Sequence, residues 1–556
     1  MTPIEELARR HLTEACSLDP CLAIAAVGVA GEDPMTDYSP AAAQQRAAAA
    51  GRTEAALERL PVTGDRDRRL AGFLRDRLRA QQEFHASGEA AAELHTSETG
   101  PLGRTRAAVE AAIPADDAAP AAREDGWRQV RMRLAALPAA LAGYQQSLAA
   151  AQAAGRVAAA RQIEACQEQC SRWAAEGQDL ANRYGDGPQR ESLLGACDMA
   201  ARGYVEFGGF LRDVLAPHAS WRQEAFGAGR YRVWVRCFLG PGLDLDELYA
   251  WGWTEFTRIE AELRREARRL DRTAPTAEVI TRLDRDRPAA TTHSREEFRR
   301  WLQRLTDQAA ERLDGTQFSI PAALRRLECR ITGTSGVRYA GPSADLTRPG
   351  RLWWGIPAGG APPPRWRAYS YAYHEGVPGH HLQIGRLACS GDWLARHLDL
   401  LGGTSPHQEG WALYAERLMD ELGGYTEPAA RIGYLVSALL RAARVVLDIG
   451  LHEHRPLPAD AGLPSGRTWT PALAGRFLRD RCYKGAAAQA ELTRYLGRPA
   501  QALTYKAGER IWLDGRQAAL PGRRTESGLR QFHAAALSLP PMGLSQLRDA
   551  LSGGRS

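Results

Sequence analysis

Residues 1–313 combine apolar and polar residues that favour α-helix, and Gly or Pro interrupts them at intervals. Ala, Leu, Arg, Glu and Gln predominate, and all of them have high helix propensity. The pattern predicts helices over residues 1–16, 41–60, 64–95, 123–154, 156–184 and 188–215. Further helices are predicted over 244–271, which begins with acidic residues, and over 294–313, which begins with a capping box of Ser294 and Glu297.

The pattern changes between residues 314 and 368, where Pro and Gly are dense and short β-prone stretches appear. These stretches predict a small sheet or hairpin, and they cover residues 328–331, 337–339 and 352–356. The run PAGGAPPP at 357–364 indicates a surface loop, and helices resume near residue 366. We therefore expect a mainly α protein with three parts that form one unit: a helical region 1–313, a β-insert 314–368 and a helical region 369–556.

Composition excludes several classes of protein. The 556 residues contain 72 Lys and Arg against 66 Asp and Glu, and a net charge of +6 over this length does not indicate a nucleic-acid-binding protein. The nine cysteines are scattered and form no CxxC pair, which is typical of free thiols in a reducing compartment. No stretch has the apolarity of a membrane span or a targeting segment. We expect a cytoplasmic protein that binds no membrane.

The most distinctive segment is YAYHEGVPGHHLQ at 371–383. A His-Glu pair followed by another His is typical of zinc hydrolases, in which two imidazoles bind Zn²⁺ and the Glu moves the proton of the attacking water. The usual HExxH spacing places both histidines on one helical face. Here Pro378 occupies the position four residues after His374, and His380 would lie about 240° around a regular helix. His381 would lie on the correct face but about 10 Å along the axis.

An interruption at Pro378 and Gly379 would resolve this geometry, because Pro removes a helical hydrogen bond and Gly permits unusual dihedral angles. It would bring His380 to the position of the second ligand, with His381 as the alternative. Glu409, 29 residues after His380, is the predicted third ligand, and Glu416 lies two turns further along the same face. The competing interpretation is that these are ordinary surface neighbours that bind no metal.

The motifs HEGVPGHHLQ and EGWALYAERLMDELGGY resemble the bacterial DUF885 family, whose pattern is HExxPGHHxQ followed by EGWALYxE. The resemblance continues through 444–452, through 494–508 and to Phe532-His533. It implies a large helical zincin-type metallopeptidase fold with a central cleft and a small β-sheet before the zinc helix, distantly similar to the M3 and M32 metallopeptidases. Those enzymes carry HExGH, and aligning their Gly-His with Gly379-His380 favours His380 as the ligand.

Several other polar residues have two interpretations each. Gln383 could orient a metal ligand from behind or be a helix-surface amide, and His381 could contact substrate or be a partly buried histidine. Arg444, Asp448 and His452 recur every four residues and would stack along one helical face. If this face lines the site, Asp448 could hold a ligand imidazole, and Arg444 and His452 could contact substrate. Otherwise the three form a charge ladder within the helix.

Two tyrosines are candidates for stabilising the oxyanion that forms during amide hydrolysis. Tyr505 is favoured, Tyr495 is the alternative, and either could instead be a packed aromatic. Lys506 or Arg494 could bind an anionic end of the substrate.

The sequence as a whole predicts a Zn²⁺-dependent hydrolase that cleaves a peptide or small amide substrate, similar to a carboxypeptidase or dipeptidase, with Glu375 as general base. One alternative is a zinc enzyme that acts on a single small metabolite in specialised biosynthesis. Another is a noncatalytic, metal-dependent binding scaffold, although a scaffold would have no need of Glu375.

Overall fold

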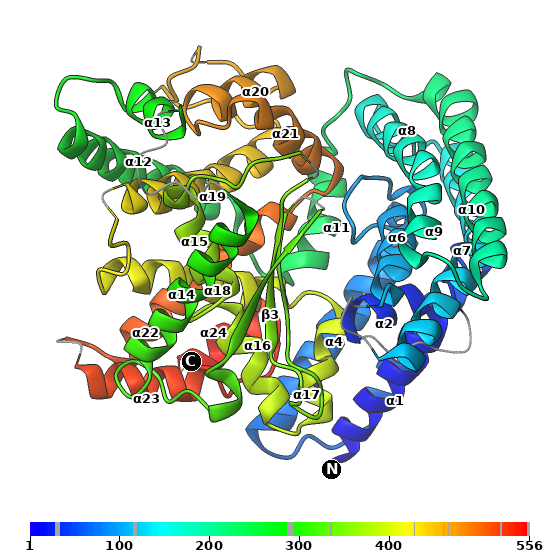
Figure 1. Ribbon diagram of the computed structural model, residues 1–556, viewed down its shortest axis with the longest axis horizontal. Helices are drawn as coiled ribbons and strands as arrows, with labels where there is room; N and C mark the ends of the chain where they lie inside the picture. The colour runs from blue at the N-terminus through cyan, green and yellow to red at the C-terminus, as the bar shows by residue number, and fades with distance from the viewer. Residues whose placement is uncertain are drawn as a thin grey trace.

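Helices form most of the computed structural model, which describes residues 1–552 except 28–33, 115–118, 286–293, 334–335, 358, 428, 460, 465 and 523–524. Ala358 of the predicted surface loop is among the exceptions. Figure 1 shows the helices of the N-terminal part, in blue to cyan, on one side of the molecule and most helices of the C-terminal part on the other. The prediction of a mainly α protein is confirmed.

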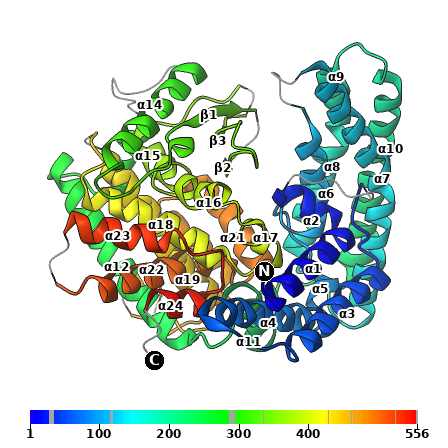
Figure 2. The same cartoon turned by 90° about the horizontal axis from the view of Figure 1, so that it is seen from below.

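The N-terminal layer contains the helices α1 (Pro3–Leu18), α2 (Pro20–Val27), α3 (Pro40–Leu57), α4 (Gly64–Ala86), α5 (Glu89–Ala92), α6 (Pro101–Ala112), α7 (Pro120–Ala153), α8 (Ala160–Ala175), α9 (Gly177–Tyr184) and α10 (Arg190–Phe210). A π-helical turn at Leu211–Leu215 and a 3₁₀ turn at Ala216–His218 follow. Two apolar clusters hold this layer together: one joins α2 and α6–α10, and the other joins α1, α3 and α4 to α17 (Trp393–His397). Figure 2 shows these helices as an arc around one side of the molecule.

Four more helices precede the sheet: α11 (Gly227–Leu239), α12 (Leu245–Leu270), α13 (Thr276–Arg285) and α14 (Arg295–Leu313). The predicted capping box is present at the start of α14, where Ser294 accepts from the backbone of Glu297. The sequence pattern does not predict α2, α6, α11 or α13. α11 contains two glycines and several β-branched and aromatic residues, which have low helix propensity. Tyr231 and Trp234 of this helix are buried in the main apolar cluster, so packing stabilises a helix that propensity does not favour.

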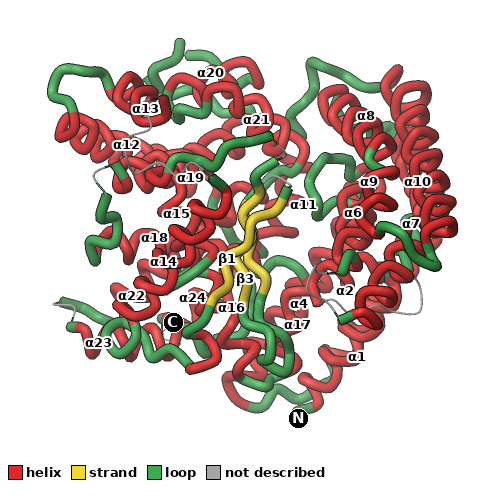
Figure 3. The backbone as a smooth tube through the Cα atoms, in the orientation of Figure 1, coloured by secondary structure: helices red, strands yellow, loops and turns green. Residues whose placement is uncertain are grey.

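The β-insert is a three-stranded mixed sheet (Figure 3) of β1 (Leu327–Thr332), β2 (Val337–Ala340) and β3 (Gly350–Gly355). β3 lies in the centre, parallel to β1 and antiparallel to β2. Alternate residues of β3 point inward, and Leu352 and Trp354 join the main apolar cluster. All three predicted strands are confirmed within a few residues.

After the sheet come α15 (Arg365–Glu375), α16 (His380–Cys389), α17, α18 (Ser405–Glu421), α19 (Ala430–His452), α20 (Pro471–Asp480), α21 (Ala488–Gly497), α22 (Thr504–Ala519), α23 (Glu526–Ala536) and α24 (Leu544–Leu551). Short 3₁₀ turns lie at Ala322–Leu324, Leu398–Leu401, Gly485–Ala487 and Gln501–Leu503. No helix in the described ranges is long and apolar enough to cross a membrane.

Close helix packing positions the elements that carry the predicted site. α18 approaches α22 so closely that a Cβ atom on Gly410 would lie 2.5 Å from the Cα atom of Gly508. α19 is buried over nearly its whole length and packs along α12, where a Cβ atom on Gly252 would lie 2.7 Å from Val445. The predicted regions 1–313 and 369–556 are therefore in direct contact through α12 and α19.

Candidate metal centre

The helix that carries His374 is interrupted as the sequence predicts. α15 ends at Glu375, and α16 begins at His380. A side chain at position 379 would collide with the backbone oxygen of His374, so only glycine fits there. The backbone N–H of Gly379 donates to the carbonyl of Tyr373 at 3.0 Å, and the indole of Trp411 donates to the carbonyl of Pro378 at 3.0 Å. These contacts fix the turn that redirects the chain into α16.

The interruption brings His374, His380 and Glu409 together. The Nε2 atom of His374 lies 3.2 Å from Glu409 Oε2, and Nε2 of His380 lies 3.8 Å from the same oxygen. One donor atom from each residue lies within 4.8 Å of the other two. Two imidazoles and one carboxylate are a ligand set that zinc sites use. α15, α16 and α18, which supply them, lie side by side in Figure 2.

Glu416 contacts the ring nitrogen of His374 that does not face Glu409. His374 Nδ1 lies 2.7 Å from Glu416 Oε1, and because a carboxylate only accepts, this nitrogen carries the hydrogen. Ser370 donates to the other oxygen of Glu416, and Arg441 lies 3.3 Å from Oε1. The arrangement leaves His374 Nε2 directed at Glu409, as in the carboxylate–histidine pairs that orient metal ligands. The sequence pattern alone does not predict this role for Glu416, although a carboxylate two turns after Glu409 on the same helical face indicates that it lies near the centre.

The electrostatics of the cluster favour a cation. Burial opposes the charge of Glu409, but the hydrogen bond and charge of His374 lower the pKa of Glu409 to about 2. Burial would likewise lower the pKa of His374, but its hydrogen bonds to Glu409 and Glu416 raise that pKa to about 10. Burial, followed by the charge of His374, lowers the pKa of His380 to about 4. Two carboxylates thus contact His374, and the donor set of His374, His380 and Glu409 fits a metal cation.

Glu375 lies next to the cluster and has no hydrogen bond or ion pair with any described residue. Its side chain is buried, with 8% of its surface exposed. Burial, together with the negative charges of Glu409 and Glu416, raises the pKa of Glu375 to about 7, against the opposing charges of His374 and Arg441. A buried carboxyl group of this kind can accept a proton near neutral pH.

The family model described as "Bacterial protein of unknown function (DUF885)" matches residues 22–551. The chain belongs to the DUF885 family. No curated protein matches this DUF885 chain.

Two solved structures share the fold of the DUF885 chain over nearly its whole length. A "putative lipoprotein" from Colwellia psychrerythraea is 18% identical with a TM-score of 0.80, and the match covers 100% of this chain and 99% of that one. A "putative lipoprotein of unknown function" from Shewanella oneidensis is 16% identical with a TM-score of 0.71, and the match covers 99% of each chain. The likeness to M3 and M32 metallopeptidases and the cytoplasmic location stay predictions.

Tyr505 and Arg494 of the DUF885 chain lie on α22 and α21, and α22 packs against α18, which carries Glu409. The guanidinium of Arg494 lies 3.4 Å from the hydroxyl of Tyr505, and that of Arg444 lies 4.7 Å from the centre of its ring. Tyr505 is half-buried, whereas Tyr495 is fully buried. The hydroxyl of Tyr495 donates to Glu491 at 2.6 Å and accepts from Arg444. The structure therefore favours Tyr505 over Tyr495 as a group that a substrate can reach.

His381 is fully buried and faces away from the cluster. Its Nε2 atom donates to the carbonyl of Leu324 at 2.9 Å, and its Nδ1 atom accepts from the hydroxyl of Tyr339 at 3.0 Å. Both ring nitrogens are thus occupied by protein groups, which favours the structural alternative over substrate binding. Gln383 donates to Nδ1 and to the carbonyl of His407, both at 3.2 Å. It ties α16 to α18 and contacts none of the three predicted ligands.

The Arg444, Asp448 and His452 ladder packs within the protein. Tyr231 donates to Asp448 Oδ1 at 2.7 Å, and the backbone N–H of Ala500 donates to the same oxygen at 2.8 Å. The expectation that Asp448 holds a ligand imidazole is therefore wrong, because Glu416 has that place.

His452 and Lys506 are likewise engaged by the protein. His452 accepts from the backbone of Phe226 at 3.2 Å and donates to the carbonyl of Tyr495 at 3.1 Å. Lys506 is buried and ion-paired with Glu255 at 3.0 Å and with Glu509. The polar atoms of both side chains are directed into the protein, which favours a structural role, and their contact with substrate stays a prediction.

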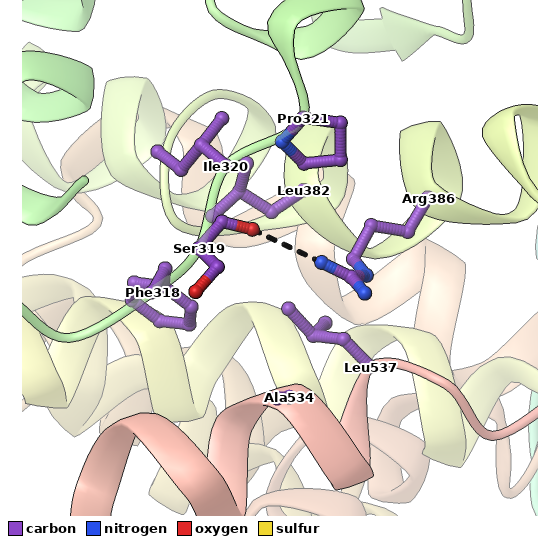
Figure 4. Close-up of a pocket in the computed structure, with 8 residues that line it drawn as sticks. All are labelled: Phe318, Ser319, Ile320, Pro321, Leu382, Arg386, Ala534 and Leu537. Carbon is purple, nitrogen blue, oxygen red and sulfur yellow. Dashed lines mark hydrogen bonds between the residues drawn. The ribbon is translucent and has the colours of Figure 1, made fainter. Parts of the chain in front are cut away.

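A small hollow elsewhere on the surface contains none of these residues (Figure 4). Phe318, Ile320 and Leu382 line its apolar side, and the guanidinium of Arg386 donates across it to the carbonyl of Ser319 at 3.1 Å. It lies against α16, but none of the three predicted metal ligands lines it.

Proposed function

We propose that this DUF885 protein is a zinc-dependent hydrolase that cleaves a peptide or related amide bond. The observation that supports it best is the convergence of His374, His380 and Glu409 beside Glu375, a buried carboxyl group with no hydrogen bond or ion pair to any residue in the described part of the chain. A zincin-type arrangement with a central cleft belongs to the same proposal.

His374, His380 and Glu409 would hold the metal, and Glu416 would keep His374 in the orientation that exposes Nε2. Zn²⁺ at this position would supply Lewis-acid polarisation of a carbonyl and lower the pKa of water. The three ligands leave a fourth position for water or substrate, as catalytic zinc sites require.

Glu375 acts as general base and then as general acid. It takes a proton from the attacking water and returns it to the leaving nitrogen of the amide. Its raised pKa suits both steps, because a group with a pKa near the working pH both accepts and releases a proton readily. Tyr505 donates a hydrogen bond to the oxyanion, with Arg494 beside its hydroxyl.

The proposal is tested by turnover of a library of dipeptides, longer peptides and acylated amides with zinc-loaded protein. Glu375→Gln should lower kcat by about 10²–10⁴-fold, because a general acid–base residue typically contributes that much. Zinc content and thermal stability should be unchanged, since Gln matches Glu in shape. Glu110→Gln, at an exposed ion pair in the N-terminal layer, is the matched control and should keep full activity.

Two results would contradict the proposal. A protein that retains no zinc after loading would remove the metal centre. Turnover by Glu375→Gln within about tenfold of wild type would remove the general base and leave the noncatalytic scaffold as the better interpretation.

A further inference from the structure

Two half-buried arginines at the end of α21 have no carboxylate partner among the residues that the structure describes. Arg494 donates to the amide oxygen of Gln501 at 2.6 Å and lies 3.4 Å from the hydroxyl of Tyr505. Arg498, four residues on, lies over the ring of Phe238 with its guanidinium carbon 4.9 Å from the ring centre. Neither guanidinium forms an ion pair with any carboxylate in the described part of the chain.

Other buried arginines nearby are paired. Arg441 lies 3.3 Å from Glu416, and Arg444 lies 3.5 Å from Glu491. Arg516, on α22, binds both oxygens of Glu421 at 2.9 and 2.8 Å. Arg494 and Arg498 are half-buried, and they differ from these three arginines because no described carboxylate is paired with them.

The surroundings of Arg498 are positive. Burial is the main cause that lowers the pKa of its guanidinium to about 10; the charge of Glu93 opposes this shift, and the charges of Arg494 and Arg104 contribute to it. Glu93 is itself bound to His95 at 3.0 Å. Two guanidinium groups one helical turn apart would attract an anion.

This site lies on the side of the candidate metal centre where α22 packs against α18. A Cβ atom on Gly410, the residue after Glu409, would lie 2.5 Å from the Cα atom of Gly508, which is one turn after Tyr505 on α22. Tyr505, the proposed oxyanion donor, contacts Arg494 directly. The N-terminal layer contacts α21 next to Arg494, where Gln162 of α8 donates to the carbonyl of Thr493 at 2.8 Å. A group bound here would belong to the same molecule as the bond that is cleaved.

We propose that Arg494 and Arg498 form a subsite for a carboxylate group of the substrate, an inference that rests on the proposed hydrolase function. Two guanidinium groups offer bidentate donors that match the two oxygens of a carboxylate. The carboxylate is either the C-terminus of a peptide or an acidic side chain beside the cleaved bond. The first would make the protein an exopeptidase that removes C-terminal residues.

Three small probes separate these sources: N-acetylglutamine, its isomer N-acetylglutamic acid α-amide, and N-acetylglutamine amide, which has no carboxylate. Their affinities are measured by calorimetry with zinc-loaded, full-length Glu375→Gln protein, which does not consume them. One of the two acids should bind about tenfold to a hundredfold more tightly than the uncharged amide, as hydrogen bonds to charged groups typically give. Preference for N-acetylglutamine indicates a C-terminal carboxylate, and preference for its isomer indicates an acidic side chain.

Arg498→Met should abolish this preference, and Arg494→Met is a second variant that tests the same point if the first does not fold. Arg516→Met, which removes a paired arginine, should keep the preference. Thermal unfolding gives an independent readout: Arg516→Met should lower the Tm because it breaks the ion pair with Glu421, whereas Arg498→Met breaks no ion pair among the described residues and should lower the Tm less.

Equal binding of all three probes, or a preference that survives both Arg494→Met and Arg498→Met, would overturn the subsite. This failure is distinguishable from failure of the hydrolase proposal. Hydrolysis of peptides without any preference for a carboxylate would support the hydrolase proposal and contradict the subsite. Selective binding of an acid without hydrolysis of any library member would support the subsite and contradict the hydrolase proposal.

Discussion

The candidate metal centre and the ladder on α19 both contain histidine and a carboxylate, but their polar atoms have different partners. In the centre, Nε2 of His374 and Nε2 of His380 both face one oxygen of Glu409. In the ladder, both nitrogens of His452 and one oxygen of Asp448 bind donors or acceptors from other helices and loops. The centre directs its ligand atoms at one another, and the ladder directs its atoms at the protein.

This difference separates binding from packing better than residue type does. Buried polar groups in proteins are almost always hydrogen-bonded, so a histidine with two protein partners needs no ligand to explain it. Lone pairs that converge on one point remain unexplained until a cation is placed among them. His381, which immediately follows a predicted ligand, belongs to the packed class by this criterion.

The strongest test of the comparison uses the two adjacent histidines. His380→Ala should abolish zinc binding, because it removes one of three protein ligands. His381→Ala should retain about one zinc per chain and lose stability instead, since Tyr339 and Leu324 would be left without their partner. Metal analysis after dialysis and thermal unfolding of both variants give the answer. Zinc loss in His381→Ala alone would move the second ligand to that residue.

A second test removes a carboxylate of the packed class. Asp448→Ala should lower the free energy of unfolding by about 2–4 kcal/mol, because it leaves the hydroxyl of Tyr231 and the N–H of Ala500 buried without an acceptor. Zinc content should not change. Denaturant unfolding monitored by circular dichroism measures the loss, and a stable variant that has lost its zinc would place Asp448 in the metal site.

The milder variant Asp448→Asn keeps an acceptor oxygen and adds a pH readout to the same test. Burial raises the pKa of Asp448 to about 7, above the value of an unfolded aspartate. The folded state therefore binds more protons than the unfolded state between about pH 4 and 7, and wild-type stability falls as pH rises through that window. Relative to Asp448→Asn, wild type should lose stability between pH 5 and pH 7.

The sequence predicts the local parts of this protein well because they depend on neighbouring residues. The capping box at Ser294, the three strands and the interruption at Gly379 are each encoded within a few positions. The three residues predicted as metal ligands, His374, His380 and Glu409, lie together in the structure, since their spacing limits where they can meet. The motif resemblance to DUF885 is confirmed over residues 22–551.

Roles that depend on distant partners are not predictable in this way. Asp448 binds Tyr231, which lies 217 positions earlier, and Lys506 binds Glu255, 251 positions earlier. Nothing in the local sequence indicates that these side chains are occupied. The same limitation hides Arg498, whose significance is the absence of a partner among the described residues.

The smallest effect is expected at Glu416. Its side chain is buried and bound by protein groups, as in the ladder, but it also contacts His374, a predicted metal ligand. Glu416→Gln keeps the shape and an oxygen for His374 Nδ1 but removes the charge that makes the imidazole a stronger ligand. Zinc affinity should fall by about 10–100-fold, the usual cost of losing such a supporting group. A competition titration with a chelator measures it, and Asp448→Asn is the matched control, a buried carboxylate on α19 that should leave zinc affinity unchanged. If both variants bind zinc as tightly as wild type, the contact between Glu416 and His374 is packing alone. If both variants weaken zinc binding equally, the ladder and the centre form one network. The distinction between polar atoms that face one another and polar atoms that bind the protein would then not hold for this protein.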